Sequence, residues 1–512
     1  MKKAVCALLS VILIFTLAAC GERGNDTGKT PDESGAVQLK EEKINLLYCH
    51  GDTFNPYTAK TKYNREISRL IYDPLIKCDN SFNPVYCLAA SAKLAGKTCT
   101  VTLKPAYWTD KTPVTAQDVV YSYNAAKNSE TIYGYSLYGV ASVSADGNTV
   151  TFNLKQCDPY FLNLLDFPII KSGSDKNKDS DGMEISPVGS GRYYISEDKK
   201  SLLRNNDYHG TLGEVSEISL LDVPDEASVL HYVEVGTADI YYADETESSI
   251  ARMSGKRADV NTNSFVYIGI NAANASLATD YTRYALSAAI DRTEICHSAY
   301  FDNATPASGY FNPVLSETSA VQSLKTVADL QISVENLAEI GYNNLDKEYY
   351  CNGAGRHLTY TLLVNSDNPS RVAAAKLIAS QCKAAGIEIK VTERSYAQYL
   401  AALESGNFQL YLGEIRVLSN MDLSSLVVPG GSAAYGVKPE TGEGQTGVCE
   451  AMINSYKKGE CSLADLAGAF LTEMPQIPVC YRKSMLFYTS RITNEATPSL
   501  SDIFFGFENN KF

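Results

Sequence analysis

The stretch Trp108-Thr-Asp-Lys-Thr-Pro-Val-Thr-Ala-Gln-Asp-Val-Val-Tyr-Ser122 is the most informative part of the sequence. The polar residues and the proline that follow the only tryptophan predict a turn. Thr115, followed three residues later by Asp118, predicts a capping box, in which each side chain satisfies a backbone N–H group at the start of a helix. We therefore expect a helix over Ala116–Lys127 and assign structural roles to Trp108 and Asp118.

Outward from this stretch, short strand patterns alternate with helical patterns, which favours an α/β fold. We expect strands at Ile44–Cys49, Cys99–Leu103, Thr149–Leu154, Ile218–Val223, Phe265–Ile270, Leu358–Val364, Glu388–Val391 and Leu410–Leu412. We expect helices at Asn64–Ile71, Ala116–Lys127, Ala227–Val235, Tyr281–Ala299, Ser370–Ala385 and Tyr396–Ser405. The chain contains no internal repeat of the length that indicates a solenoid or propeller.

Several motifs occur in an order that is typical of one protein family. They are Phe54-Asn55-Pro56, Ile71-Tyr-Asp-Pro-Leu75, Trp108–Ser122, Pro187-Val-Gly-Ser-Gly-Arg-Tyr193, Ile268-Gly-Ile-Asn271 and Arg283-Tyr-Ala-Leu-Ser-Ala-Ala-Ile-Asp-Arg292. Together they resemble the signatures of family 5 extracellular solute-binding proteins, which are the dipeptide-, oligopeptide- and nickel-binding components of ABC importers. The resemblance runs from about residue 44 to the C-terminus.

This resemblance implies a two-lobed α/β fold of the periplasmic-binding-protein type, of the large three-subdomain type II variety, with a hinge and a ligand cleft between the lobes. By analogy, lobe I holds residues 43–264 and 485–512, with a subdomain at about 79–183, and lobe II holds residues 265–484. Ligand is then captured by hinge closure, because it contacts both lobes and favours the closed state.

In peptide-binding members of the family, a lobe II segment resembling G-W-x-x-D carries an aspartate that pairs with the peptide ammonium. The matching segment here is Gly413-Glu414-Ile415-Arg416-Val417, followed by Leu418-Ser419-Asn420-Met421-Asp422. Val417 falls at the aspartate position, and Arg416 adds a positive charge beside it. The resemblance therefore leaves free-amine peptides in question.

Three interpretations of this segment stay open. Glu414 or Asp422 serves as the ammonium anchor after a local shift, or Arg416 holds an anionic ligand bidentately, or these residues have no contact with ligand. Asn55 and Tyr57, after the first strand, and Arg371, at the start of a lobe II helix, are further candidates by their position in the family's cleft. Their structural alternatives are a turn asparagine, a packed tyrosine and a surface arginine.

The N-terminus has the pattern of an export signal. Lys2 and Lys3 precede an apolar run from Ala4 to Leu17, which ends at Leu17-Ala18-Ala19-Cys20. The run is too short to span a bilayer and resembles a bacterial lipobox. We expect residues 1–19 to be a signal peptide, Cys20 to carry lipid on the outer face of the cytoplasmic membrane, and residues 20–42 to form a polar, flexible tether.

Composition argues against several partners. The net charge of −14 becomes about −16 once Lys2 and Lys3 are removed, which disfavours nucleic acid and anionic lipid. Of thirteen cysteines, eleven remain after Cys6 leaves with the signal and Cys20 is lipidated, and no C-x-x-C occurs. We expect most of these to be buried free thiols, such as Cys99, and we predict no metal ion and no cofactor.

Other functions have less support. An exported hydrolase is not favoured, because the chain has no G-x-S-x-G or H-E-x-x-H motif and its five histidines are scattered. A ligand-presenting sensor lipoprotein, or a binder of an anionic metallophore or opine-like solute, stays an alternative on the same fold. We expect a monomer whose partners are a small-molecule or peptide ligand, an ABC permease and, through Cys20, the membrane.

Overall fold

A computed structural model describes residues 43–178, 180, 185–244, 255–437, 447–493 and 495–509. The segment around Trp108 folds as its residues predict. The backbone N–H of Asp118 donates to Thr115 Oγ1 at 3.3 Å, and the backbone N–H of Thr115 donates to Asp118 Oδ2 at 2.9 Å. This confirmed capping box starts α2 (Ala116–Lys127), and Trp108 is buried in the neighbouring core.

The largest sheet has eleven strands, in the order β17-β16-β18-β12-β19-β11-β1-β10-β9-β8, with β13 beside β19. Its strands are β1 (Ile44–Tyr48), β8 (Tyr193–Ile195), β9 (Ser201–Arg204), β10 (Glu217–Asp222), β11 (Ile240–Ala243), β12 (Lys256–Ile270), β13 (Ala304–Pro306), β16 (Thr359–Asn365), β17 (Glu388–Arg394), β18 (Leu410–Arg416) and β19 (Gln476–Tyr488). A four-stranded sheet has the order β4-β5-β7-β6, and two strand pairs are β2 with β3 and β14 with β15. These strands are β2 (Ile76–Cys78), β3 (Pro84–Tyr86), β4 (Ala89–Ala95), β5 (Thr98–Leu103), β6 (Val140–Asp146), β7 (Thr149–Leu154), β14 (Asn344–Asp346) and β15 (Tyr349–Cys351).

Helices pack on these sheets. Besides α2 they are α1 (Lys62–Ile71), α3 (Ile132–Ser136), α4 (Glu226–Glu234), α5 (Asp280–Ala289), α6 (Arg292–Ser298), α7 (Leu330–Glu339), α8 (Pro369–Ala384), α9 (Tyr396–Glu404), α10 (Ser424–Val427), α11 (Val448–Tyr456) and α12 (Leu463–Glu473). The predicted single helix Tyr281–Ala299 is wrong. Ile290 is extended, and the Asp291 side chain accepts from the Glu294 backbone N–H, so that a new helix, α6, starts there.

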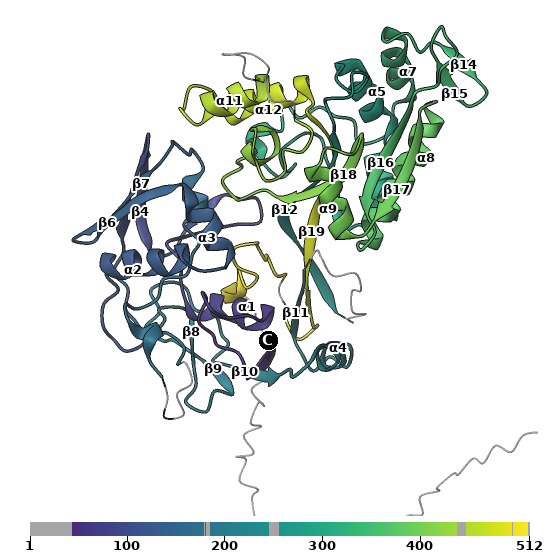
Figure 1. The fold of residues 1–512 in the computed structure, drawn as a ribbon. Coiled ribbons are helices and arrows are strands. Elements are labelled where there is room, and N and C mark those ends of the chain that lie inside the picture. The colour runs from purple at the N-terminus through teal and green to yellow at the C-terminus, as the bar shows by residue number, and fades with distance from the viewer. Residues whose placement is uncertain are drawn as a thin grey trace, which may run out of the picture. The chain divides into compact units, whose positions relative to one another are not determined.

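Two long antiparallel strands, β12 and β19, connect the two halves of the large sheet (Figure 1). Residues Met485–Tyr488 of β19 pair with β11, whereas residues Ser264–Ile270 of β12 pair with β18. The register of β12 shifts between Asn261 and Ser264, and Asn263 there has φ = 57°. The two predicted lobe boundaries, between residues 264 and 265 and between residues 484 and 485, fall in these two strands and stay a prediction.

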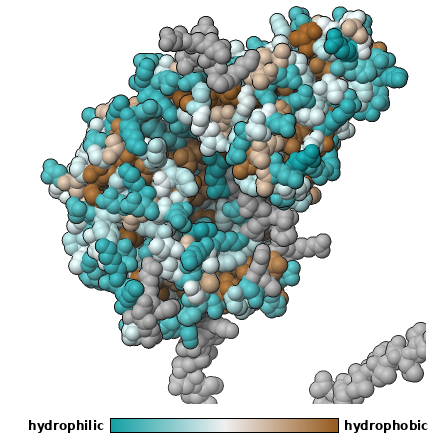
Figure 2. Space-filling model, in the orientation of Figure 1, coloured by the Kyte–Doolittle hydropathy of each residue, from teal (hydrophilic) through white to brown (hydrophobic). Residues whose placement is uncertain are grey.

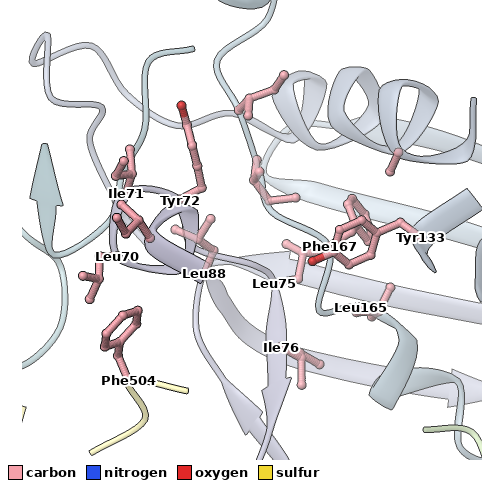
Figure 3. Close-up of a cluster of buried hydrophobic side chains, with 14 of the residues drawn as sticks. Leu70, Ile71, Tyr72, Leu75, Ile76, Leu88, Tyr133, Leu165, Phe167 and Phe504 are labelled. Carbon is pink, nitrogen blue, oxygen red and sulfur yellow. The ribbon is translucent and has the colours of Figure 1, made fainter. Parts of the chain in front are cut away.

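The buried apolar residues form separate clusters along the same division. One cluster draws on residues between Ile44 and Ile240 and returns at 486–507, whereas two others draw, apart from Phe82, on residues 265–481. Figure 3 shows part of the first cluster, in which Phe504 lies on the side of Leu70, at the end of α1, and Phe167 lies with Tyr133 on the other side. The C-terminal segment is thus packed into the N-terminal core.

The surface hydropathy and the state of the cysteines can be described for the residues in the structure. On the face shown in Figure 2, hydrophobic residues lie in small separate groups within a mostly hydrophilic surface. Within the described parts of the chain, no helix combines the length and the apolar character that crossing a membrane requires. All eleven cysteines from Cys49 to Cys480 are free thiols, and eight of them are buried, as predicted.

Candidate ligand-binding site

An apolar cavity of about 440 Å³ lies between the segment 135–164 and the segment 418–466. Its walls include Leu154, Phe161, Leu164, Leu418, Met421, Leu423, Ile453 and Tyr456, with the exposed rings of Tyr135 and Tyr138 at the side. Four charged side chains also line it, namely Lys155, Asp158, Asp422 and Lys457. Its volume and its mixture of apolar walls with few charges are typical of a small-ligand site.

The pKa of Asp158, one of these four groups, is raised by its surroundings. It follows β7 in the sequence Cys157-Asp158-Pro159, and its Oδ2 accepts a 2.7 Å hydrogen bond from Asn420 Nδ2 on the opposite wall. Burial, together with the charge of Asp422, raises the pKa of Asp158 to about 6, although the bond from Asn420 acts in the other direction. Asp422 has its own partner, since Lys457 Nζ lies 2.8 Å from its carboxylate. Asp158 is thus a carboxylate whose surroundings undercompensate its charge.

A second cavity, of about 350 Å³, shares Ser136, Leu164 and Leu418 with the first, so the two cavities are adjacent. Its charged lining consists of four basic side chains, Lys62, Arg65, Arg69 and Arg416, and four acidic ones, Glu66, Glu130, Asp166 and Asp244. Burial raises the pKa of Glu66 and that of Asp166. The balance of charge makes this cavity suitable for a ligand that carries both signs.

Ring and hydrogen-bond contacts fix the wall of the second cavity. Arg69 Nη1 donates to the Asp166 carbonyl at 3.4 Å, and its guanidinium lies 5.7 Å from the centre of the Tyr133 ring. Tyr133 makes an edge contact with Tyr57, and the Tyr57 hydroxyl donates to the Pro168 carbonyl. Neither Arg69 nor Tyr133 could be predicted from a local motif, because Arg69 lies in α1 and Tyr133 in α3, and their contact exists only in the folded chain.

Of the predicted site residues, Arg416, Val417 and Asp422 line the two cavities. Arg416 is the last residue of β18 and lies on the wall of the second cavity. Val417 is buried in an apolar cluster, and its backbone N–H donates to the Asn263 carbonyl at 3.0 Å. Asp422 belongs to the first cavity, where its Oδ1 accepts from the Ser424 backbone N–H at 2.9 Å.

Glu414, Ile415 and Arg371 lie away from both cavity linings. Glu414 forms an ion pair with Arg371, in which the two side chains are only 13% and 15% exposed, and Arg482 Nη1 lies 3.7 Å from the same carboxylate. Ile415 packs against an apolar cluster. A direct role of these three residues in ligand binding stays a prediction.

Asn55 and Tyr57 are both buried beside the second cavity, whereas Pro56 between them lines it. Asn55 Oδ1 accepts from the Tyr57 backbone N–H at 3.1 Å, which is the turn role weighed from the sequence. Tyr57 reaches the cavity wall only through its edge contact with Tyr133. Their contact with ligand also stays a prediction.

A match to a known family covers most of the chain. Residues 83–429 match the family described as bacterial extracellular solute-binding proteins, family 5 (middle). The chain belongs to this family. The predicted assignment to the solute-binding proteins of ABC importers is therefore confirmed.

Individual relatives and solved structures agree with the family. The chain is 24% identical over 412 residues to the oligopeptide-binding protein AppA of Bacillus subtilis (strain 168), covering 76% of each protein. It is 26% identical over 344 residues to the periplasmic murein peptide-binding protein MppA of Escherichia coli (strain K12), covering 60% of this chain and 62% of that protein.

Two solved structures of solute-binding proteins share the fold. The unliganded open form of MppA has a TM-score of 0.72 at 18% identity and covers 88% of this chain and 94% of its own. The nickel ABC transporter protein of Bacillus halodurans has a TM-score of 0.71 at 19% identity and covers 89% and 96%. The predicted two-lobed α/β class is thereby confirmed.

One group of metal-ligating side chains was not predicted. Asp73, Cys87 and His209, which are far apart in the sequence, come together outside both cavities, with one donor atom of each within 4.8 Å of the others. Among the described residues, no other group of three such side chains was found. The sequence lacks a spacing motif for this group because each residue comes from a different loop.

Proposed function

We propose that this solute-binding protein captures peptides that have a free N-terminal ammonium group and delivers them to an ABC permease. It is exported and anchored by lipid on Cys20 to the outer face of the cytoplasmic membrane. Cys20 lies outside the described residues, and the support for the anchor is the charged, apolar and small-residue pattern that ends at Leu17-Ala18-Ala19-Cys20. Relatives named for oligopeptides and murein peptides support the ligand class.

The observation that carries the ligand proposal is the environment of Asp158. A half-buried carboxylate with a pKa raised to about 6 faces an apolar cavity, and within the described part of the chain it forms no ion pair. A ligand ammonium would provide the missing charge and form a charge-assisted hydrogen bond, which is stronger than a neutral one. The apolar walls would accept the side chain that follows the amine.

The second cavity extends the argument to the rest of the ligand. Its arginines Arg65, Arg69 and Arg416 are groups that bind a carboxylate, and the cavity wall also carries Lys62 and four acidic side chains. A zwitterionic peptide that spans both cavities matches this pattern. An anionic metallophore or opine, held through Arg416, is the alternative, but a strongly negative ligand would meet four acidic side chains in the same cavity.

A ligand screen by thermal shift tests the proposal on the full chain. We expect free-amine peptides with an apolar first residue to raise the melting temperature, and the same peptides with an acetylated N-terminus to raise it much less. Asp158→Asn should remove this difference, whereas Asp146→Asn, an exposed acid of the same region, should keep it. If a carboxylate-rich chelate stabilises the protein and all free-amine peptides fail, the peptide proposal is wrong.

The lipid anchor is tested separately. Cys20→Ser should release the protein from the membrane fraction while its ligand-binding properties stay unchanged. Retention of the variant in membranes to the same extent as the original chain would contradict lipidation at this residue.

A further inference from the structure

A buried group of metal-ligating side chains joins three segments of the N-terminal core, away from the proposed ligand cavities. Asp73 follows α1, Cys87 lies between β3 and β4, and His209 lies in the loop after β9. The Asp73 and His209 side chains are 2% and 5% exposed, and Cys87 is 4% exposed. One oxygen, one sulfur and one nitrogen donor lie within 4.8 Å of one another.

We propose that Asp73, Cys87 and His209 bind a divalent transition-metal ion of the zinc class. Carboxylate, thiolate and imidazole are the three side-chain ligands that proteins use for Zn²⁺, and ions of this class accept mixed oxygen, sulfur and nitrogen donors. The Tyr208 hydroxyl lies 3.4 Å from Asp73 Oδ1 and provides a further oxygen beside the site. The ion connects the end of α1, the β3–β4 connection and the loop after β9.

The hydrogen bonding of His209 supports a ligand at this site. His209 Nε2 lies 2.7 Å from Asp73 Oδ2, while its Nδ1 is buried and has no hydrogen-bond partner among the described residues. A buried ring nitrogen without a partner is unfavourable, because it has left water without gaining a replacement bond. An ion bound by His209 Nε2 and Asp73 Oδ2 would take the place of the proton that joins these two atoms.

The charges around the group also leave room for a cation. Lys77 Nζ and Arg192 Nη2 each lie 3.0 Å from Asp502, and Arg192 also pairs with Glu508, so two basic groups meet two acidic ones. The one ion pair of Asp73 among the described residues is with His209, which carries a charge only when protonated. A divalent ion bound by one thiolate and one carboxylate is electrically balanced.

The backbone holds the donors in place before any ion arrives. The Cys87 backbone N–H donates to the Leu75 carbonyl at 2.9 Å, and the Ile169 backbone N–H donates to the Asp73 carbonyl at 2.9 Å. A thiol must lose its proton to bind a metal ion, so the affinity of the site should fall as the pH is lowered.

Cobalt titration of the full chain, after treatment with chelator and reductant, tests the site. We expect one equivalent of Co²⁺ to produce the absorption of a thiolate-to-cobalt charge transfer, and Zn²⁺ to displace it. The unaltered protein alone can overturn the proposal. If Co²⁺ produces no such absorption at one equivalent, or if zinc analysis of the reduced protein finds no bound ion after Zn²⁺ addition, the site does not exist.

Matched variants locate the site. Cys87→Ala should abolish the cobalt absorption and His209→Ala should lower Co²⁺ affinity at least about tenfold, whereas Cys382→Ala, which removes a buried thiol from α8, should change neither. Zn²⁺ should raise the melting temperature of the original chain and of Cys382→Ala but not of Cys87→Ala. Equal binding by Cys87→Ala would assign the ion to another thiol and refute the proposal. Peptide binding is measured in parallel, and its outcome is independent of this one.

Discussion

Replacement of Asp158 by asparagine should separate stability from ligand binding. The pKa of Asp158 rises from 3.8 to about 6, chiefly because of burial. A shift of about two units corresponds to at most about 3 kcal/mol against the ionised form, and solvent at this half-buried position lowers that figure. Asparagine has the same shape without the charge, and the unpartnered Asn420 Oδ1 can accept from its amide after Asn420 turns over.

The sign of the effect depends on pH. Because the pKa of Asp158 is higher in the folded than in the unfolded protein, the folded state binds the proton more tightly. The free energy of unfolding should therefore decrease as the pH rises from about 4 to about 6, and the penalty should be complete above that range. Asp158→Asn should stabilise the ligand-free protein at neutral pH, by at most about 3 kcal/mol, and have little effect below pH of about 4.

The same substitution should weaken peptide binding. If a ligand ammonium restores the ordinary pKa of Asp158, the lost interaction corresponds to at most about a hundredfold in affinity at neutral pH. Calorimetry with a free-amine peptide and with its N-acetyl form, together with urea unfolding at two pH values, measures both effects. A variant that is no more stable at neutral pH and that binds the free-amine peptide unchanged would refute the reasoning.

Two further substitutions test the packing around the site. Glu414→Gln should lower the free energy of unfolding by about 3 kcal/mol, because it leaves Arg371 charged and buried without its ion-pair partner; a urea unfolding curve that matches the original would contradict the buried pair. Gly191→Ala should destabilise by about 1–3 kcal/mol, because its Cβ would lie 2.5 Å from the Leu70 carbonyl oxygen, whereas Gly139→Ala, whose Cβ meets nothing within 4 Å, should not show that penalty. Thermal melts of the two glycine variants provide the comparison.

The elements that could be predicted are those whose signal is local. Thr115 and Asp118 are three residues apart, and their reciprocal hydrogen bonds need no distant partner. The strand Thr149–Leu154 was predicted at its observed bounds because one of its faces is buried. In contrast, β19 was missed, since it is buried on both faces and contains Pro478, so its sequence does not alternate.

The candidate site was predicted only in part, for a related reason. Arg416, Val417 and Asp422 were reached through the family resemblance, because a short motif aligns that segment without knowledge of the fold. Asp158 gave no such signal, and its importance comes from Asn420, which lies 262 residues away in the chain. A raised pKa is a property of the surroundings, and the surroundings exist only once the chain has folded.

The proposed position of the ammonium also links ligand capture to closure. The family's anchor position is occupied by Val417, which is buried in an apolar cluster and cannot pair with an amine. Asp158 and Asp422 instead face one cavity from opposite walls, and the charge of Asp422 raises the pKa of Asp158. The charge of Asp422 makes ionisation of Asp158 less favourable, and a cation between the two carboxylates would reverse that effect. A ligand amine would therefore favour the closed arrangement, because it can interact with the carboxylates of both walls only when the walls are close. Closure requires such a difference in affinity between the open and the closed state.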